Sequence, residues 1–521
     1  MKKYIILSAA IIFSLNVFSQ APAIQWQKCL GGTGFEIANS MEQTSDGGYI
    51  VAGYSDSNDS IVTGNHGDND YWVVKLSNAG YIQWQKCYGG TSTDEATSVK
   101  QSIDGGYIVA GWSSSNDSDV TGNHGDIDCW IIKLDSTGAL QWQKSYGGTD
   151  WDDAESIQQT NDGGYIFSGF SGSTNGDVVG NHGGFDYWVV KLDGTGNIQW
   201  QKCYGGTNNE GAYSIQQTND GGYIVAGSSA SNDGDVAGNH GGGDYWIVKL
   251  DSTGTLQWQR CYGGTNDDEA FSIQQTTDGG YIVAGESNSN NIDVTGNHGS
   301  YDYWIVKLDS VGILQWQKTY GGINSDAALC IEQANDGGYI AGGASDSNDG
   351  DVTGHHGNVG LYQYDYWIVK LNSTGLLLWQ ESYGGTVTEA VKAIQQAFDG
   401  GYVALGSTSS SDGDVIGLHG GIDGWILKFT PEVGIEENNF LSSTTLSPNP
   451  FHETATLTIN TNKFEDGTIE IKNILGAIVQ PPKHFTGNKI TLQRNNLPAG
   501  IYFYTITLKE NIMLHGKSIV Q

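Results

Sequence analysis

The stretch DGGYIVAGSSASNDGDVAGNHGGGDYWIVKLDSTGTLQWQR, residues 220–260, decides the fold because close copies of it recur along the chain. Its Trp-Gln pair is repeated 58 residues apart five times and 63 residues apart once. The seven pairs begin at Trp26, Trp84, Trp142, Trp200, Trp258, Trp316 and Trp379. A period this regular is the signature of a fold built from repeated structural units.

One repeat contains four short runs rich in β-branched and aromatic residues, separated by Gly, Asp, Asn and Ser. In the fourth repeat these runs are 214–218, 223–226, 245–250 and 256–260. Such runs are typical of strands joined by tight turns, and four antiparallel strands form one blade of a β-propeller. We name them A, B, C and D from the centre outward. The sequence therefore predicts an all-β protein with a seven-bladed β-propeller.

The phase of the repeat predicts how the ring closes. The chain begins with an isolated D-type run, Ile24 to Lys28, and the last repeat ends at its C strand, Trp425 to Phe429. We expect the N-terminal strand to complete the seventh blade, because closure removes open sheet edges. The alternative is an open solenoid with an exposed half-blade at each end.

The six cysteines are predicted to be buried free thiols. Four of them, Cys29, Cys87, Cys203 and Cys261, occupy the same position on the D strands of different blades. Such positions diverge around a ring, beyond the Cα separation of about 7 Å that a disulfide can span. Cys129 and Cys330 lie on other strands, without an evident partner.

Composition and charge narrow the function. The chain has 521 residues, with 76 Gly, 27 Tyr and 16 Trp, and is too rich in aromatics for a disordered protein. Its net charge is −34, and residues 21–439 alone carry −38 because both ends of the chain are net positive. So acidic a body repels nucleic acid and anionic membranes and suits cations or neutral ligands better. No nucleic-acid partner is expected.

The first residues are predicted to be a signal peptide, residues 1–19. Lys2 and Lys3 precede an apolar run from Tyr4 to Val17, and a small residue, Ser19, ends the segment. The alternative is a membrane anchor, but the run is too short to favour one. No other long apolar stretch follows, so we expect no transmembrane segment after cleavage.

Two resemblances support the fold. The C–D hairpin KLDSTGALQWQK, Lys133 to Lys144, resembles the repeat of pyrroloquinoline-quinone-type propellers, with the Asp one residue closer to the Trp. This resemblance covers only the hairpin and implies the fold, not the cofactor. The His, Asp and Trp that recur in each repeat are similar to those of WD-repeat propellers.

We expect these repeated residues to be structural. Every blade needs its B–C loop held in place, whereas an active site needs different residues that converge on one substrate. The repeated set is His66, Asp70, Trp72, His124, Asp128, Trp130, His182, Asp186, Trp188, His240, Asp244, Trp246, His298, Asp302, Trp304, His356, Asp365, Trp367, His419, Asp423 and Trp425.

No catalytic residue and no cofactor are predicted. The sequence has no Gly-x-Ser-x-Gly, HExxH or phosphate-binding motif. Loops such as Ser231 to Asp235 are rich in oxygen ligands, so calcium stays a possible ligand. They lack the DxDxDG spacing of the usual calcium loop, and turn chemistry explains them equally.

The C-terminal residues form a separate module. After a linker, 431–445, that follows the propeller, 20–430, alternating runs predict a small Ig-like β-sandwich over 446–521. The motifs SPNPF (447–451), LPAGIYFY (497–504) and HGKSIV (515–520) resemble the type A sorting domain of the type IX secretion system. The motif residues are Pro448, Asn449, Pro450, Gly500, Tyr502, Gly516 and Lys517.

This resemblance implies a Gram-negative bacterium of the Bacteroidota and the type IX machinery as a partner. It also implies export to the cell surface or the medium. The alternative is an ordinary Ig-like accessory domain.

Binding is predicted on the face of the D–A and B–C connections, which we expect to be the long ones. Long loops on a rigid scaffold carry most binding residues, and aromatic rings beside carboxylates suit a neutral sugar. The repeat symmetry breaks there at Tyr54, Trp112, Trp151, Asp152, Asp153, Phe170, Tyr362 and Tyr364. We expect a non-enzymatic protein that binds a glycan or a protein. The alternatives are an extracellular enzyme that acts on polysaccharide and a purely structural spacer.

Overall fold

The computed structural model describes residues 20–432, 443–460, 466–473, 477–508 and 513–520. The chain divides into two compact units, Met1–Glu432 and Val433–Gln521. The predicted signal peptide and most of the predicted linker lie outside the described residues. Each unit is described separately below.

The fourth repeat forms one antiparallel four-stranded sheet, as predicted. Its strands are β14 (Glu210–Gln217), β15 (Tyr223–Ser229), β16 (Asp244–Leu250) and β17 (Leu256–Tyr262). The predicted start of the A strand at residue 214 is wrong. A β-bulge at Tyr213 interrupts the alternation of side chains and hides the first half of the strand.

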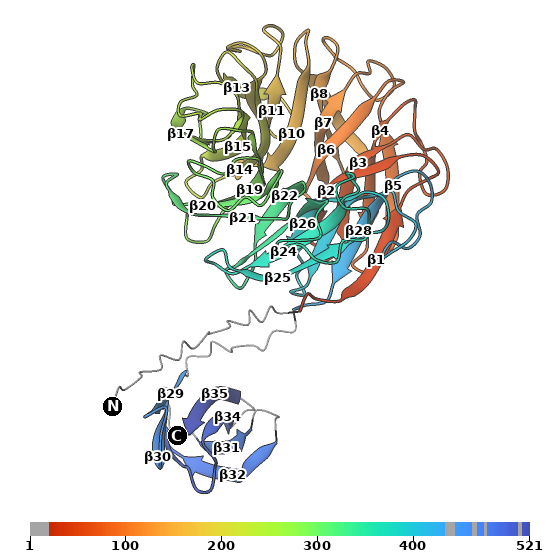
Figure 1. Ribbon diagram of the computed structural model, residues 1–521. Coiled ribbons are helices and arrows are strands. Elements are labelled where there is room, and N and C mark those ends of the chain that lie inside the picture. Colours follow the sequence, from red (N-terminus) through yellow and green to blue (C-terminus); the bar gives the residue numbers. More distant parts are fainter. Residues whose placement is uncertain (1–19, 433–442, 461–465, 474–476, 509–512, 521) are drawn as a thin grey trace. The chain divides into compact units, whose positions relative to one another are not determined.

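Six further sheets repeat this pattern, and Figure 1 shows all seven arranged around one axis. Blades 1 to 3 are β2 (Glu36–Gln43), β3 (Tyr49–Ser55), β4 (Asp70–Leu76), β5 (Ile82–Tyr88); β6 (Asp94–Gln101), β7 (Tyr107–Ser113), β8 (Asp128–Leu134), β9 (Leu140–Tyr146); β10 (Asp152–Gln159), β11 (Tyr165–Ser171), β12 (Asp186–Leu192) and β13 (Ile198–Tyr204). Blades 5 to 7 are β18 (Asp268–Gln275), β19 (Tyr281–Ser287), β20 (Asp302–Leu308), β21 (Leu314–Tyr320); β22 (Asp326–Gln333), β23 (Tyr339–Ser345), β24 (Asp365–Leu371), β25 (Leu377–Tyr383); β26 (Glu389–Gln396), β27 (Tyr402–Thr408), β28 (Asp423–Phe429) and β1 (Ile24–Leu30).

The N-terminal strand β1 is the outer strand of the seventh blade. It pairs antiparallel with β28, and Cys29 lies opposite Trp425. The Gln27 side chain accepts a hydrogen bond from Trp425 Nε1 at 3.0 Å and donates to the Asp414 carbonyl at 2.8 Å. The predicted role of residues 24–28 is therefore confirmed, and the strand continues to Leu30.

A ring of hydrogen bonds links neighbouring blades at the A–B turns. The last Gln of each A strand accepts a bond from a backbone N–H in the turn of the preceding blade. The donor and acceptor pairs are Ser45 and Gln101, Ile103 and Gln159, Asn161 and Gln217, Asn219 and Gln275, Thr277 and Gln333, Asn335 and Gln396, and Phe398 and Gln43. The last pair, at 2.8 Å, joins blade 7 to blade 1 in the same way as the other six junctions.

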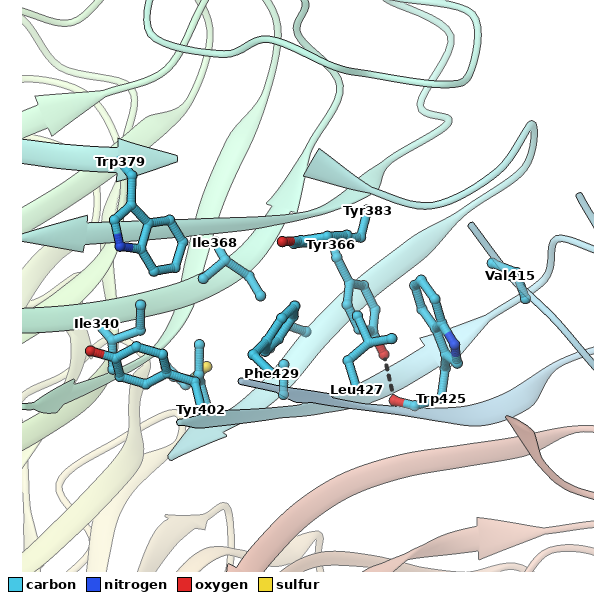
Figure 2. Close-up of a cluster of buried hydrophobic side chains, with 14 of the residues drawn as sticks. Ile340, Tyr366, Ile368, Trp379, Tyr383, Tyr402, Val415, Trp425, Leu427 and Phe429 are labelled. Carbon is cyan, nitrogen blue, oxygen red and sulfur yellow. Dashed lines mark hydrogen bonds between the residues drawn. The ribbon is translucent and has the colours of Figure 1, made fainter. Parts of the chain in front are cut away.

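Aromatic side chains fill the space between blades. The C-strand Trp of every blade is fully buried. Between blades 6 and 7, the Tyr366 ring packs against Trp425 at 4.7 Å, and its hydroxyl donates to the Trp425 carbonyl at 2.9 Å (Figure 2). Four other junctions repeat this bond, but Cys129 and Gly424 replace the Tyr in blades 2 and 7. Those two junctions therefore depend on packing alone at this point.

The predicted His–Asp pairing is present in all seven blades. In blade 1, His66 Nδ1 lies 2.6 Å from Asp70 Oδ2, and the His66 backbone N–H donates to the same oxygen at 2.9 Å. The Asp is fully buried and begins the C strand, so the pair fixes the end of the B–C loop to the sheet. The remaining pairs lie at 2.6 to 2.7 Å.

Each of these Asp residues also faces a carboxylate of the next blade across a glycine. A Cβ atom on Gly89 would lie 2.7 Å from Asp70 Oδ1 and 2.5 Å from Asp94 Oδ2, so only glycine fits between them. The same arrangement occurs at Gly31, Gly147, Gly205, Gly263, Gly321 and Gly384. Burial raises the pKa of Asp94 to about 6 and that of its blade-6 counterpart Asp326 to about 7.

All six cysteines are buried and free, which confirms the prediction. Burial raises the pKa of the Cys29 thiol to about 12, with the negative charge of Asp423 adding to the effect. These thiols are poor nucleophiles and serve as small apolar side chains.

The connections between strands differ from the prediction in one respect. In blade 4 the A–B, C–D and D–A connections all span five residues, 218–222, 251–255 and 205–209, whereas the B–C connection spans fourteen, 230–243. The expectation of a long D–A connection is wrong because the A strand begins earlier than its alternation indicates. Only the B–C loops extend far from the sheets.

The C-terminal unit is a two-sheet β-sandwich. One sheet has the order β29 (Ser443–Ser447), β30 (Thr454–Asn460), β33 (Lys489–Gln493), and the other β32 (Ile478–Thr486), β31 (Asp466–Lys472), β34 (Gly500–Leu508), β35 (Met513–Val520). Buried side chains from both sheets form one core, among them Leu457, Ile469 and Ile506. The sequence did not predict β32, because Pro481 and Pro482 lie in this edge strand.

Removal of β1 tests how far the ring depends on its closure. A chain that begins at residue 31 exposes the edge of β28 and loses the burial of Cys29 and Leu30. We expect the free energy of unfolding of the propeller to fall by about 4 kcal/mol, measured by chemical denaturation against a chain that begins at residue 20. A chain that ends at residue 432 is the control and should keep the stability of the propeller. Equal stability of the chains that begin at residues 20 and 31 would contradict this role of β1.

The paired carboxylates predict an unusual dependence of stability on pH. The pKa values of Asp94 and Asp326 are higher in the folded than in the unfolded chain, so folding takes up protons between about pH 4 and pH 7. We therefore expect the melting temperature to rise as the pH falls from 8 to 5. Below about pH 4 it should fall again, because hydrogen bonds from Thr44, Gly48 and Lys75 hold the pKa of Asp46 down to about 2 and protonation breaks the ion pair with Lys75.

The variant Asp326→Asn removes one of these groups and should reduce the rise between pH 8 and pH 6. The control is Asp68→Asn, which changes an exposed carboxylate in the B–C loop of blade 1. A melting temperature that falls steadily from pH 8 to pH 5 would show that the carboxylates are not protonated in the folded state.

Candidate functional site

The seven copies of the repeat can be compared with one another. Positions that hold the same residue in every blade do work that every blade needs, such as the paired His and Asp above. Positions that differ between blades are free to serve a function. Within the A and B strands the differences concentrate at the ends next to the D–A and B–C connections.

Three aromatic side chains cluster at this end of blade 3. The Trp151 ring lies 6.1 Å from both Phe170 and Phe185, and the last two rings are 5.4 Å apart. Trp151 is 43 % exposed. We call these three residues the aromatic triad. It brings together Trp151 and Phe170, which were predicted, with Phe185, which was not.

Phe185 and the counterpart of Trp151 in blade 1 were missed by sequence reasoning. Phe185 precedes the C-strand Asp, where the other blades have Asn69, Ile127, Gly243, Tyr301, Tyr364 and Ile422. Phe35 takes the place of Trp151 in blade 1 and is 51 % exposed. The sequence signal for these two residues was the difference between blades at their positions. That difference can be read only when the first residue of each A and C strand is known, because both positions directly precede a strand.

Tyr54 and Trp112 take the place of Phe170 in blades 1 and 2. Both are half-buried, and Trp112 lies opposite Glu95 in the sheet. Burial and the charge of Glu95 raise the pKa of Tyr54 to about 12. These two residues line the same end of their own blades and are not part of the aromatic triad.

Asp152 is not available to a ligand, which corrects the prediction. It is fully buried, and its carboxylate accepts bonds from the Ser171 hydroxyl, from the Gly148 N–H at 2.7 Å and from the Ser173 hydroxyl at 2.8 Å. It is the blade-3 member of the repeated carboxylates. Asp153 is 4 % exposed, and its Oδ1 atom has no hydrogen-bond partner among the described residues.

Tyr362 and Tyr364 form a second aromatic group, in the B–C loop of blade 6. Their rings are 6.4 Å apart, and Tyr362 is 73 % exposed. The Tyr362 N–H donates to Asp346 at 2.9 Å, and Thr388 donates to the Tyr362 carbonyl at 3.2 Å. The structure therefore spreads the predicted aromatic residues over blades 1, 2, 3 and 6, and brings predicted rings together only in blades 3 and 6.

The bulged residue of each A strand faces the wall of the central channel. The Asn39 amide donates to the Ala96 carbonyl of the next blade at 2.9 Å, and Tyr213 packs on Phe271 of the next blade at 5.5 Å. The seven residues are Asn39, Thr97, Glu155, Tyr213, Phe271, Leu329 and Lys392. Burial raises the pKa of Glu155 to about 7, and the charge of Lys392 opposes this shift.

Two carboxylates face each other at the same end of blade 5. Glu269 on β18 lies directly opposite Glu286 on β19. Burial, with the nearby charge of Glu269, raises the pKa of Glu286 to about 7. A carboxyl group with such a pKa can exchange a proton near neutral pH.

The Asn- and Asp-rich loops use their oxygens internally. Asp233 accepts bonds from the Thr207 N–H at 2.8 Å and from the Thr207 hydroxyl at 2.9 Å. Among the residues that the structure describes, no three His, Cys, Asp or Glu side chains form a group that could hold a metal ion. Calcium binding stays an untested alternative to the prediction of no cofactor.

In the C-terminal unit the three sorting motifs lie side by side. Asn449 Oδ1 accepts a bond from the Ile519 N–H at 2.8 Å, and the Phe451 N–H donates to the Ile519 carbonyl at 2.9 Å. The backbone of β34 pairs with β35, where Tyr504 lies opposite Gly516. The Tyr502 hydroxyl donates to the Pro498 carbonyl at 2.9 Å. The residues shared with sorting domains therefore form one edge of the sandwich.

Comparison with known proteins agrees with this module. Residues 445–521 match the family model of the secretion system C-terminal sorting domain. The regulatory protein FlaEY of Caulobacter vibrioides is 23 % identical over 447 residues, which cover 76 % of this chain and 44 % of FlaEY. The chain therefore spans less than half the length of that relative.

Two solved structures are among those to which the chain is similar. The extracellular domain of a hybrid two-component system from B. thetaiotaomicron has a TM-score of 0.41 and 11 % identity, with 96 % of this chain and 60 % of that chain covered. The Pan2 WD40 domain of Neurospora crassa has a TM-score of 0.43 and 9 % identity, over 79 % and 99 % of the two chains.

The sorting domain determines where the protein acts. The described part of the chain contains no helix long and apolar enough to cross a membrane. The matched C-terminal family and the motif contacts agree with the resemblance to type IX sorting domains. The chain is a β-propeller protein that its C-terminal sorting domain directs to the outer-membrane surface or to the medium.

Proposed function

We propose that the propeller is a non-catalytic binding module that recognises an extracellular glycan through the aromatic triad of blade 3. The observation that carries this proposal is the exposure of Trp151 beside two further rings. Exposed apolar side chains that gather in one patch are typical of ligand-binding surfaces, and only blade 3 has a Trp at this position.

The chemistry of the triad favours a neutral sugar ring. The apolar face of a pyranose stacks on aromatic rings, and polar groups nearby bind its hydroxyls. Polar side chains lie next to the triad, because Asn209 Oδ1 accepts the Phe185 N–H at 3.0 Å and Asn209 lies in the adjoining D–A connection. The acidic body of the propeller disfavours polyanions at this face.

A second candidate is an enzyme that acts on polysaccharide, and the Glu269–Glu286 pair favours it. Opposed residues of an antiparallel pair have Cβ atoms about 5 Å apart, so the two carboxyl groups can serve one substrate. Glycoside hydrolysis needs one carboxyl group protonated near neutral pH, which the raised pKa of Glu286 provides. The proposal of a purely structural spacer predicts neither binding nor catalysis.

The binding proposal is tested by substitution of Trp151. With the chain from residue 20 to 521 on a glycan array, we expect Trp151→Ala to weaken binding about tenfold, because a stacked ring is removed. Trp151→Phe should keep most of the binding. Phe35→Ala removes the exposed counterpart in blade 1 and should leave binding unchanged.

Melting temperatures of the three variants separate binding from folding. If Trp151→Ala binds as the unchanged chain does, the triad is not the binding site. If it loses binding only together with the melting temperature, the rings are part of the core.

The enzymatic candidate is tested by the release of reducing ends from a panel of soluble polysaccharides. If Glu286 is a general acid, Glu286→Gln should lower the rate by at least about a hundredfold, since proton transfer contributes that much. The control is Glu95→Gln. Glu95 occupies the same A-strand position in blade 2 as Glu269 does in blade 5, but it lies opposite Trp112, so this variant should release reducing ends at a nearly unchanged rate. The absence of any release by the unchanged chain would reject this candidate.

A further inference from the structure

A second ring of hydrogen bonds surrounds the channel. Its acceptor side chains lie one residue before the Gln side chains that accept the bonds at the A–B turns. In six blades the backbone N–H of the last A-strand Gln donates to a side-chain oxygen of the preceding blade. The donor and acceptor pairs are Gln43 and Gln395, Gln101 and Glu42, Gln217 and Gln158, Gln275 and Gln216, Gln333 and Gln274, and Gln396 and Glu332.

The seventh bond is missing because its acceptor is replaced by a lysine. Lys100 of blade 2 stands where the other blades have Gln or Glu, and an ammonium group cannot accept a hydrogen bond. The Gln159 N–H therefore has no acceptor within residues 20–432, although it occupies the same edge of its strand as the six bonded ones. The Lys100 ammonium likewise makes no hydrogen bond or ion pair within 4.0 Å in the described part of the chain, although its charge acts on Glu332 of the channel.

A cavity of about 740 Å³ opens at this break. Lys100 and Gln159 line it together with side chains that carry amides and hydroxyls, among them Gln158, Thr160 and Asn161. The A–B turn residues in its wall place it on the short-turn face, opposite the aromatic triad. A smaller cavity within the channel shares Lys100, Gln158 and Gln216 with it.

The cavity also contains one carboxylate, that of Glu42. Its Oε2 atom already accepts the Gln101 N–H, so its charge is partly engaged. Glu332 of the channel cavity accepts the Gln396 N–H at 3.0 Å in the same way. Two donors without acceptors, the Gln159 N–H and the Lys100 ammonium, thus remain for a ligand.

We propose that this cavity binds a carboxylate carried on a neutral, hydroxyl-rich body, such as a uronic acid. One carboxylate oxygen takes the place of the missing side-chain oxygen and accepts the Gln159 N–H, and the charge pairs with Lys100. The surrounding amides and hydroxyls bind the sugar hydroxyls. A single carboxylate suits the site, since the net charge of the propeller repels polyanions. This site is separate from the aromatic triad and independent of the function proposed for it.

The test uses sodium glucuronate and its neutral counterpart glucose as probes, with the chain from residue 20 to 521. By NMR titration or calorimetry, the unchanged chain should bind glucuronate at least about tenfold more tightly than glucose, since a charge-assisted bond to the carboxylate is absent with glucose. Lys100→Gln restores the residue found in blades 3, 4, 5 and 7 and should remove this preference while keeping or raising the melting temperature.

The control Lys318→Gln makes the same change of charge at an exposed position of β21, the D strand of blade 5. It should leave glucuronate binding unchanged. Trp151→Ala should also leave it unchanged, which separates this site from the triad. The proposal is overturned if the unchanged chain does not bind glucuronate or does not prefer it over glucose. It is equally overturned if Lys100→Gln binds glucuronate as before, or if Lys318→Gln loses binding to the same extent.

Discussion

The pairing of β1 with β28 is the contact on which the rest of the propeller depends. Each blade is a small sheet that can bury its two faces only between two neighbours. In an open arc the first and last blades would each leave one face in water, together with the aromatic residues that pack there. The bond between Phe398 and Gln43 shows that closure gives the last junction the same geometry as the others. The matching of all seven junctions is therefore a property of the closed ring and not of one blade.

The architecture could be predicted from the sequence because the Trp-Gln pair and the DGGY turn mark every blade at a constant spacing. The limits of the A strands could not, because the bulge shifts the alternation by one residue. Asp152 was misassigned for a related reason. Its counterparts are Asp in some blades and Glu in others, so the position does not stand out as a repeated carboxylate. Phe185, Glu286 and Lys100 stand out only after each residue is placed in its register, since until then they are three differences among many.

Comparison of the seven repeats distinguishes the residues of the two candidate sites, which differ between blades, from the residues that hold the ring, which recur in most or all blades. Several bonds hold each junction, so a blade can lose one of them and still be kept in place by the others. Blade 3 gains an exposed ring at Trp151, and its junction with blade 2 loses an acceptor at Lys100. These changes lie on opposite faces of one rigid ring. A protein held at the cell surface or released from it can present both faces to polymers outside the cell.

The position of β1 also affects how the chain reaches its folded state. Gln27 and Trp425, which bond across the closing strand pair, are 398 residues apart. Contacts between such distant residues form slowly, so each molecule passes through an open arc in which six blades are complete and the edge of β28 is bare. That edge can pair with the β1 of a second molecule in place of its own. At high concentration the folding ring therefore competes with an exchange of β1 between copies, which links two propellers through their seventh blades.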